Sequence, residues 1–414
     1  MDRASVSVPS LASRAEHEEY LGEIFSTSHT RRFPWMNGGM GVDLSNDTLV
    51  KAVMAEGGAG TLSASAVGFN ARREQILAEL SLERRVELFQ QANRDEILRQ
   101  IRSVREAFPY GILSVNILVP MNDFDSLVED IGSSGEVDLL FPAAGLPRGL
   151  AKQMEQYPHM RYAPLVSGPR AAQIMMSAAD KSGGRPPDAF YVELPQFAGG
   201  HLGAKDVEDA MNTEPADPAH LDGPRKFDAE VLIQQIREVA RGIPLILAGG
   251  IAYGQDIKRA HDLGYDGVSM GTRLLLTQES GMPNHLLEKY YLDSRYRVTK
   301  TMTSPAGLPS SIVEGPVLPV LTEDVVREIR SRCVSCIGQK RCQFFRPGGE
   351  EHSYCIARRL PASRRGEEGG VLFTGSRLEE MRNDTLYTLD GKPYIPTAQE
   401  AMSFVFSGMR GNVE

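Results

Sequence analysis

The sequence predicts an α/β fold, a (β/α)8 barrel of the TIM type, followed by a small C-terminal module that is rich in cysteine. Two observations support this prediction. Short apolar runs, each ended by Gly, Pro or Asn, alternate with helical patterns, as expected for parallel strands buried on both faces. The runs also number eight, which favours a closed barrel over the doubly wound open sheet that has the same local alternation.

The expected elements follow one another in a regular order. The expected strands lie at Phe33–Met36, Ala59–Ser63, Ile112–Asn116, Val137–Phe141, Tyr162–Val166, Ala189–Glu193, Pro244–Ala248 and Gly267–Met270. The expected helices lie at Asp47–Glu56, Arg72–Phe108, Asp123–Ile131, Arg148–Gln156, Pro169–Ala179, Asp228–Arg241 and Gly254–Leu263.

This order divides the chain into three expected regions. Residues 1–24 are predicted to be a polar tail, residues 25–315 the barrel, and residues 316–414, where the alternation stops, the separate module. The segment Ala198–Pro224 follows the sixth expected strand and contains glycines, acids and prolines without a clear period. In a barrel this loop would lie over the catalytic face, so it is a candidate lid.

Composition excludes several classes of protein. Of the 414 residues, 41% are hydrophobic and 24% charged, which is ordinary for a globular domain. The net charge of −9 disfavours a general nucleic-acid surface. No apolar run approaches the roughly 18 residues of a membrane helix, and the first residues lack the apolar core of a signal peptide. We therefore expect a cytoplasmic enzyme.

Two glycine sites follow the last two expected strands and predict a phosphate site. Gly249 and Gly250 follow the seventh strand, and Gly271 and Thr272 follow the eighth. In barrels these two loops commonly bind phosphate, because backbone N–H groups can approach an anion where side chains are absent. The alternative is a pair of structural turns, since glycine also permits tight turns.

A third glycine loop, PWMNGGMG, follows the first expected strand and indicates a flat ligand. Gly38 and Gly39 would let such a ligand lie against the backbone, and Asn37 and Met40 could offer polar groups. Asn116 ends the third strand at the same barrel mouth. A phosphate at one end and a planar body at the other describe flavin mononucleotide (FMN). A dinucleotide fits less well, because no strand is followed by the GxGxxG fingerprint with its acidic partner.

His201 is the candidate catalytic residue. It lies just past the sixth expected strand in VELPQFAGGHLG, after Gly199 and Gly200, which leave room around the ring. Its near-neutral pKa suits proton abstraction, although a lone histidine is often structural. Glu193 ends the same strand and either orients a partner or is a structural acid. We count Glu193, Gly199 and Gly200 with the residues expected at the cofactor.

The motifs NGGMG, SVN, AGGHLG, LAGGI and MGTR, in this order, resemble the nitronate monooxygenase family, which includes related FMN-dependent enoyl-carrier-protein reductases. The resemblance runs from about Phe33 to Pro316. It implies an FMN-binding barrel in which Asn37–Met40 and Asn116 flank the isoalloxazine ring. It also implies that Gly249, Gly250, Gly271 and Thr272 hold the phosphate and that His201 is catalytic. The long helical insertion after the second strand and the lid loop depart from the family pattern and leave the substrate open.

All four cysteines lie close together, with the spacing Cys333-x2-Cys336-x5-Cys342-x12-Cys355. Four thiolates satisfy a tetrahedral zinc site or a [4Fe–4S] cluster equally well in number. Two disulfides are a third interpretation, which a cytosolic setting disfavours. The blocks YCIARRL and GGVLFTGSR resemble one branch of the flavoprotein family, and this resemblance favours the [4Fe–4S] cluster over zinc.

The expected function is FMN-dependent oxidation of alkyl nitronates by oxygen. One alternative is a reductase that passes electrons from NAD(P)H through FMN and the cluster to an enoyl thioester. An alternative of another class is a non-catalytic flavin-binding subunit of a larger assembly. The expected partners are therefore small molecules, with a homo-oligomer also open.

Overall fold

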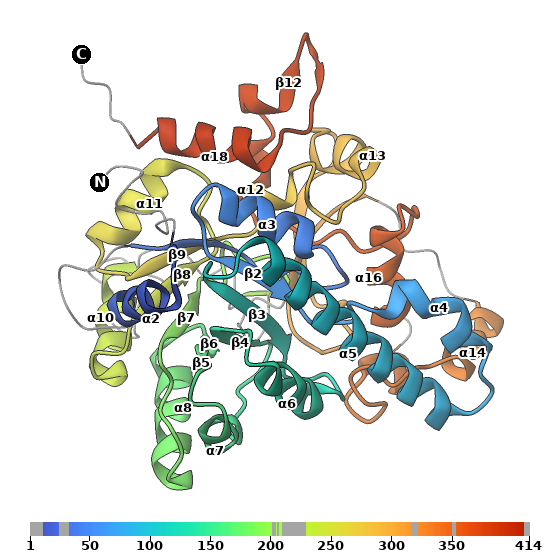
Figure 1. Cartoon of the computed structure of the whole chain (residues 1–414). Helices are drawn as coiled ribbons and strands as arrows, with labels where there is room; N and C mark the ends of the chain where they lie inside the picture. The colour runs from blue at the N-terminus through green and yellow to red at the C-terminus, as the bar shows by residue number, and fades with distance from the viewer. Residues whose placement is uncertain are drawn as a thin grey trace, which may run out of the picture.

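Parallel strands form the centre of the structure, a computed structural model that describes residues 11–24, 33–200, 204, 207–208, 229–315, 322–349 and 353–409. The strands form two parallel sheets with the orders β1-β9-β8-β7-β6 and β2-β3-β4-β5 (Figure 1). Their bounds are β1 Trp35–Asn37, β2 Gly60–Ser63, β3 Leu113–Leu118, β4 Leu139–Ala143, β5 Arg161–Tyr162, β6 Leu165–Val166, β7 Phe190–Glu193, β8 Leu245–Ala248 and β9 Gly267–Met270.

The two sheets meet at two seams, and together they form one ring. At the first seam, a parallel bridge between Met36 and Ala59 joins β1 to β2. At the second, β5 and β6 are one strand path broken at Pro164, which has no N–H to donate to a sheet. The Ala163 N–H donates to Leu140 of β4, and the Tyr191 N–H of β7 donates to Pro164. The ring therefore has eight strand positions, as the sequence predicts.

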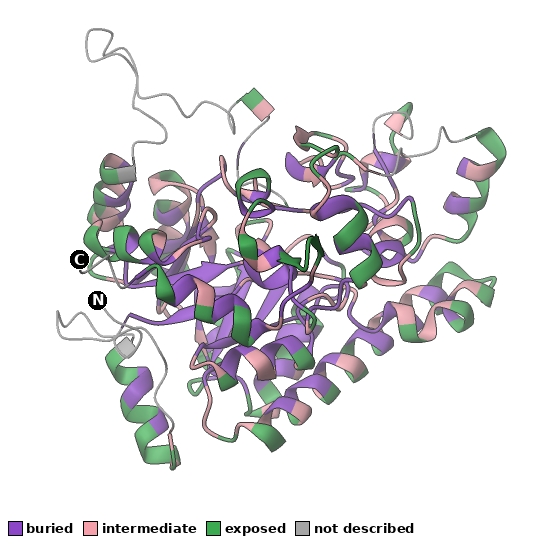
Figure 2. Ribbon diagram, turned by 90° about the horizontal axis from the view of Figure 1, so that it is seen from above, coloured by how far each residue is buried: buried purple, intermediate pink, exposed green. Residues whose placement is uncertain are grey.

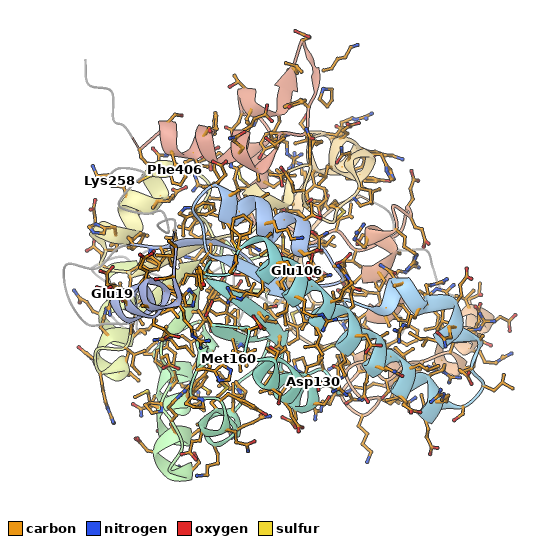
Figure 3. All side chains as sticks on the ribbon, in the orientation of Figure 1. Glu19, Glu106, Asp130, Met160, Lys258 and Phe406 are labelled. Carbon is orange, nitrogen blue, oxygen red and sulfur yellow. The ribbon has the colours of Figure 1, made fainter. Side chains whose placement is uncertain are left out.

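Helices cover the outside of the ring. Strands β2, β4, β8 and β9 are buried along their whole length, and Figure 2 shows these buried strands at the centre with exposed residues on the outer helices. Charged side chains such as Glu19, Glu106 and Lys258 lie at the surface (Figure 3). The helices between the strands are α3 Asp47–Ala55, α4 Phe69–Ala78, α5 Leu82–Ala107, α6 Phe124–Ser134, α7 Leu150–Gln153, α8 Pro169–Ser182, α10 Ala229–Ala240 and α11 Gly254–Asp262. In the part of the chain that is described, none of the helices has the length and apolar character needed to span a bilayer.

The N-terminal segment contains a helix, α2 (Arg14–Ile24), within the region expected to be a polar tail. Tyr20 and Leu21 are buried in the cluster that fills the barrel interior, with Met36 and Ile246 among its members. His17 Nε2 lies 2.7 Å from Asp138 Oδ1 at the start of β4. The helix therefore covers the N-terminal end of the barrel, and its buried positions 17, 20 and 21 have the spacing of one helix face.

The C-terminal part packs on the barrel along its length. The elements after the last barrel strand are α12 Thr272–Leu275, α13 Asn284–Leu286, β10 Val298–Thr301, β11 Ser310–Val313, α14 Glu323–Ser331, α16 Ile356–Arg364, α17 Leu378–Met381, β12 Thr388–Leu389, β13 Lys392–Pro393 and α18 Ala398–Ser407. Short 3-10 or π turns lie among them at Leu287–Tyr291, Gln343–Phe345 and Thr385–Tyr387, and a further 3-10 turn, Met154–Gln156, follows α7 within the barrel. Phe344 and Ile356 share a hydrophobic cluster with Phe69 and Leu88 of α4 and α5. The separate module expected from residue 316 stays a prediction. In the structure, residues of this region and of the barrel share one hydrophobic cluster.

One buried cation fastens this C-terminal part to the last barrel loop. The Arg273 side chain is fully buried, and its Nη2 lies 2.8 Å from Asp384 Oδ2. Its Nη1 donates to Tyr387 Oη at 3.0 Å, and its Nε donates to the Ala252 carbonyl at 3.0 Å. The guanidinium also lies over the Tyr253 ring, 5.0 Å from its centroid. Each of the three guanidinium nitrogens therefore donates to a partner, which stabilises the buried charge.

Replacing Arg273 with methionine should destabilise the fold by about 3–5 kcal/mol, because it leaves the Asp384 carboxylate without its buried cation. Chemical denaturation followed by circular dichroism measures the change. The matched control is Arg295→Met, which removes an exposed arginine from its pair with Asp293 and should leave the midpoint unchanged. Equal midpoints for both variants would contradict the anchoring role.

Candidate functional site

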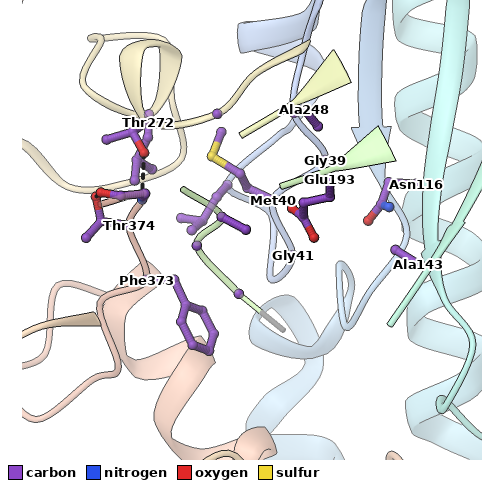
Figure 4. Close-up of a pocket in the computed structure, with 18 of the residues that line it drawn as sticks. Gly39, Met40, Gly41, Asn116, Ala143, Glu193, Ala248, Thr272, Phe373 and Thr374 are labelled. Atoms are coloured by element: carbon purple, nitrogen blue, oxygen red, sulfur yellow. Dashed lines mark hydrogen bonds between the residues drawn. The ribbon is translucent and has the colours of Figure 1, made fainter. Parts of the chain in front are cut away.

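The carboxyl ends of the strands surround a cavity of about 250 Å³ (Figure 4). Its lining comes from the loops after β1, β3, β7, β8 and β9 and from a C-terminal stretch near Phe373. In a barrel this end is where ligand-binding residues gather. Eleven of the twelve residues that the sequence suggests for the cofactor line this one cavity: Gly38, Gly39, Met40, Asn116, Glu193, Gly199, Gly200, Gly249, Gly250, Gly271 and Thr272.

Asn37 is the exception, because its side chain joins two strands inside the barrel wall. It is fully buried, its Nδ2 donates to the Thr61 carbonyl at 2.7 Å, and its Oδ1 accepts from the Thr61 N–H at 2.7 Å. Both ends of the amide are thus used between β1 and β2. The structure therefore gives this asparagine a role in strand pairing and does not bring it to the cavity surface.

The loops after β8 and β9 form one end of the cavity. Gly249 and Gly250 have φ angles of +82° and +80°, which favour glycine. A Cβ on Gly250 would also lie 3.0 Å from the Phe197 ring. Within the described residues, the backbone N–H groups of Gly250, Gly271 and Thr272 have no hydrogen-bond acceptor. Unpaired amides on adjacent loops suit an anionic group such as a phosphate.

A C-terminal stretch that the sequence did not suggest as part of the site completes this end. The Gly375 N–H donates to Thr272 Oγ1 at 2.8 Å, and Arg377 Nη1 donates to the Gly250 carbonyl at 2.7 Å. Arg377 also pairs with Asp256. Thr374, Gly375 and Arg377 line the cavity. Their signal in the sequence is a basic residue beside a small-residue turn, TGSR, which is too common a pattern to identify a site.

The loop after β1 lies against β3 at the other side of the cavity. A Cβ on Gly39 would come within 2.2 Å of Asn116 Cβ, so only glycine allows this approach. Asn116 Nδ2 donates to the Phe141 carbonyl at 3.1 Å, which fixes the orientation of its amide. The Met40 N–H donates to Ser45 Oγ. This side thus offers a close, mostly backbone surface, which suits a flat ligand.

Glu193 is the only carboxyl that lines the cavity within the described residues. It ends β7, and its side chain points into the cavity in Figure 4. Its carboxyl has no hydrogen-bond or ion-pair partner in the described part of the chain, and burial raises its pKa to about 8. Its neighbour on the same face, Tyr191, donates to Ser269. Glu193 therefore keeps its proton at neutral pH and can donate a hydrogen bond to a ligand.

His201, the candidate catalytic residue, lies outside the described residues, as does most of the candidate lid Ala198–Pro224. Gly199 and Gly200 before it line the cavity. The Gly199 carbonyl accepts the Ser311 N–H at 2.7 Å, which ties the start of this loop to β11. The role of His201 stays a prediction.

The four cysteines line a second cavity of about 90 Å³, and Cys336 lines both cavities. Burial raises the pKa of the Cys336, Cys342 and Cys355 thiols. Among the described side chains, no group of three or more Cys, His, Asp or Glu is arranged to hold a metal ion. A zinc site needs such a group, because thiolates about 2.3 Å from one ion must lie close together. The structure thus supports neither zinc nor a [4Fe–4S] cluster, and the cluster stays a prediction.

Replacing Glu193 with glutamine should remove a pH-dependent loss of stability in the flavin-free protein. Its carboxyl keeps its proton up to about pH 8 in the folded chain, whereas its ordinary pKa is 4.5. The folded state therefore binds more protons between these values, and stability falls as pH rises across that window. At high pH, the free energy of unfolding of Glu193→Gln should therefore exceed that of the wild type. The difference should stay below roughly 5 kcal/mol, because each unit of difference between the folded and unfolded pKa contributes at most about 1.36 kcal/mol.

Urea unfolding at a series of pH values measures this gain, with the exposed Glu106→Gln as the matched control. Parallel pH profiles for wild type and Glu193→Gln would show that the carboxyl ionises normally and would contradict its environment in the structure.

Comparisons with known proteins identify the family of this chain. The family model described as nitronate monooxygenase matches residues 23–384. A curated relative, (3aS,4S,5R,7aS)-5-hydroxy-7a-methyl-1-oxo-octahydro-1H-indene-4-carboxyl-CoA dehydrogenase of Mycobacterium tuberculosis, is 38% identical over 72 residues. That match covers 17% of this chain and 20% of the relative, so the chain matches only about a fifth of the relative's length.

Two solved structures share the fold over almost the whole chain. Nitroalkane oxidase from Streptomyces ansochromogenes is 17% identical with a TM-score of 0.59, covering 94% of this chain and 97% of that one. The enoyl reductase domain of MlnA from Bacillus amyloliquefaciens is 12% identical with a TM-score of 0.60, covering 96% and 97%. These likenesses confirm the predicted fold. Because the family model spans most of its length, the chain belongs to the nitronate monooxygenase family and is an oxidoreductase.

Proposed function

We propose that this chain is an FMN-dependent enzyme that oxidises alkyl nitronates with oxygen. The observation that carries the proposal is the single cavity in which eleven of the twelve suggested residues meet. At one end of it the N–H groups of Gly250, Gly271 and Thr272 lack acceptors within the described chain. At the other, Gly39 and Asn116 form a close surface. This arrangement fits a molecule with a phosphate and a planar ring.

The residues present fit FMN at both ends. The loops Gly249–Ile251 and Gly271–Thr272 would hold the phosphate through their backbone N–H groups. Arg377, whose charge is balanced by Asp256 and Glu380, fixes the carbonyl of Gly250 in the first of these loops. Gly38–Met40 and Asn116 would contact the ring. The stretch Thr374–Arg377 lies against both phosphate loops. The adenosine part of FAD would have to extend past this stretch, so the arrangement favours FMN over FAD. Bound FMN would supply the redox chemistry.

The chain's own contribution is to orient the substrate and to handle its proton. Glu193 would donate a hydrogen bond into the cavity in its neutral form. His201 would take the proton beside a nitro group, or position a nitronate already formed, in the role that the family resemblance implies. A histidine suits this role because its pKa is close to neutral.

A second candidate function is reduction of an enoyl thioester with electrons from NAD(P)H. It is favoured by one specific observation, that Cys336 lines both the main cavity and the cysteine cavity. The described cysteines are not grouped to hold a metal, so this alternative depends on finding iron and acid-labile sulfide in the purified protein. We assign no step to a [4Fe–4S] cluster. The fold shared with the MlnA enoyl reductase domain is compatible with this alternative.

Replacing Gly271 with leucine should abolish flavin binding without unfolding the barrel. A Cβ at Gly271 would have no atom within 4 Å, and the residue lines the cavity, so the new side chain would fill the space proposed for the phosphate. Flavin content after purification, with the released flavin identified by chromatography, measures the effect. The matched control is Gly149→Leu, an exposed glycine that also has nothing within 4 Å. Stoichiometric flavin in Gly271→Leu, or FAD in the wild type, would contradict the site.

Mixing substrates with the FMN-loaded protein in the absence of oxygen should separate the two candidate functions. An alkyl nitronate should remove the visible flavin absorbance within one turnover, because the substrate itself provides the electrons. NADH and NADPH should act far more slowly. Rapid loss of absorbance with NADH or NADPH, and none with nitronates, would contradict the proposal and support the reductase.

The same experiment on His201→Asn tests the proton role. This variant should keep its flavin and react about 10²-fold more slowly with a neutral nitroalkane, the usual effect of losing a general base. A preformed nitronate should lose less rate, because its proton is already absent. Equal losses of rate with the nitroalkane and the nitronate would show that His201 contributes to substrate binding and not to proton transfer.

A further inference from the structure

The lining of the main cavity is of two chemical kinds. Apart from the glycine loops and their polar groups, it contains large apolar side chains from two parts of the chain: the end of β3 with the turn after it, and the C-terminal region from α16 to Phe373. Each of these side chains both lines the cavity and belongs to, or packs against, one hydrophobic cluster, so they form a continuous surface. We call this surface the apolar wall; its large members are Leu118, Met121, Ile356, Leu360, Val371 and Phe373.

The apolar wall keeps surface open to the cavity. Met121, Ile356 and Val371 are buried, whereas Leu118, Leu360 and Phe373 are only partly buried although they pack against the cluster. An apolar ligand that covers this surface removes it from water, and this burial favours binding. Figure 4 shows the Phe373 ring on the side of the cavity away from Asn116.

Charged groups lie elsewhere in the cavity. Within the described lining, the only cation is Arg377 and the only carboxyl is Glu193. Arg377 bonds to Gly250 and pairs with Asp256 at the phosphate end. Glu193 ends β7 and carries its proton at neutral pH. The apolar wall therefore offers no ionic partner from the described residues, and a small polar substrate would leave it uncovered.

We propose that the apolar wall is the substrate subsite, and that the substrate carries its reacting group on an alkyl or acyl chain that packs against it. This inference rests on the proposed function, because it takes the glycine loops as the flavin site and leaves the apolar wall for the substrate. In this proposal the C-terminal region, and Leu360 of α16 in particular, contributes to specificity for the chain length of the substrate.

The test measures kcat/KM for two homologous series with the FMN-loaded wild type. One series consists of primary alkyl nitronates from two to eight carbons, and the other of trans-2-enoyl thioesters from four to ten carbons with NADPH. Each added methylene that reaches the wall should raise kcat/KM about threefold to fourfold, as expected for burial of one methylene. The gain should stop where the wall ends.

The Leu360→Trp variant fills part of this subsite. It should lower the ratio of kcat/KM for the longest over the shortest substrate by about tenfold or more, since long chains lose contact that short ones never make. The matched control is Leu80→Trp, because Leu80 is exposed between α4 and α5. Its ratio of kcat/KM for the longest over the shortest substrate should equal that of the wild type. Both variants must contain wild-type amounts of FMN, which shows that each is folded.

A binding measurement separates failure of this inference from failure of the proposed function. Saturated alkanamides from four to ten carbons carry no reacting group, and their binding can be followed by the change in the flavin spectrum. Tighter binding of longer amides, weakened in Leu360→Trp and not in Leu80→Trp, supports the subsite even if neither substrate series reacts. Affinities and rates that do not depend on chain length, or equal ratios in the two variants, would overturn it.

Discussion

The close contact between the C-terminal region and the last two barrel loops is the constraint on which the candidate site depends. The Gly375 N–H donates to Thr272 Oγ1 across 103 residues of sequence, and Arg377 donates to the Gly250 carbonyl. Next to Thr272, the buried Arg273 binds Asp384 and Tyr387. Two neighbouring residues of one loop thus hold the chain on both sides of α17. Barrel loops are mobile unless something packs on them, and here the packing comes from the same chain.

This arrangement makes the C-terminal region part of the catalytic end of the barrel. The region contributes polar atoms beside the loops after β8 and β9, through Thr374 to Arg377, and apolar side chains to the cavity lining, through α16. It also places Cys336 where the two cavities meet. Strand β7 adds Glu193, the one carboxyl among the lining residues that the structure describes. The barrel loops therefore supply most of the proposed cofactor site, and the C-terminal region supplies much of the remaining cavity lining.

The barrel was predictable from sequence because its strands are buried on both faces and so appear as unbroken apolar runs. The prediction for Gly267–Met270 matches β9, and the others differ from the structure by one or two residues. The expected strand Tyr162–Val166 is broken at Pro164, whose missing N–H interrupts the ladder. The glycine loops were predictable as well, since their spacing from the strands fixes them at one end of the barrel.

Other parts of the site depend on contacts that no local pattern contains. Asn37 was expected at the cofactor, but whether a residue at a strand end faces the cavity or the next strand depends on the twist of the barrel. Thr374–Arg377 and α16 have ordinary local sequences, and only the tertiary fold brings them to the cavity. Helix α2 carried a usable signal in the spacing of His17, Tyr20 and Leu21, which the surrounding charged residues obscured.

The central claim is that the barrel loops and the C-terminal region form one cofactor site. Hydrogen–deuterium exchange with and without FMN is its most direct test. The claim predicts that FMN slows exchange both in the loops around Gly250 and Thr272 and in the stretch Phe373–Arg377. Both responses should be lost together in Gly271→Leu. Protection confined to the barrel loops, with no change in the C-terminal stretch, would contradict it.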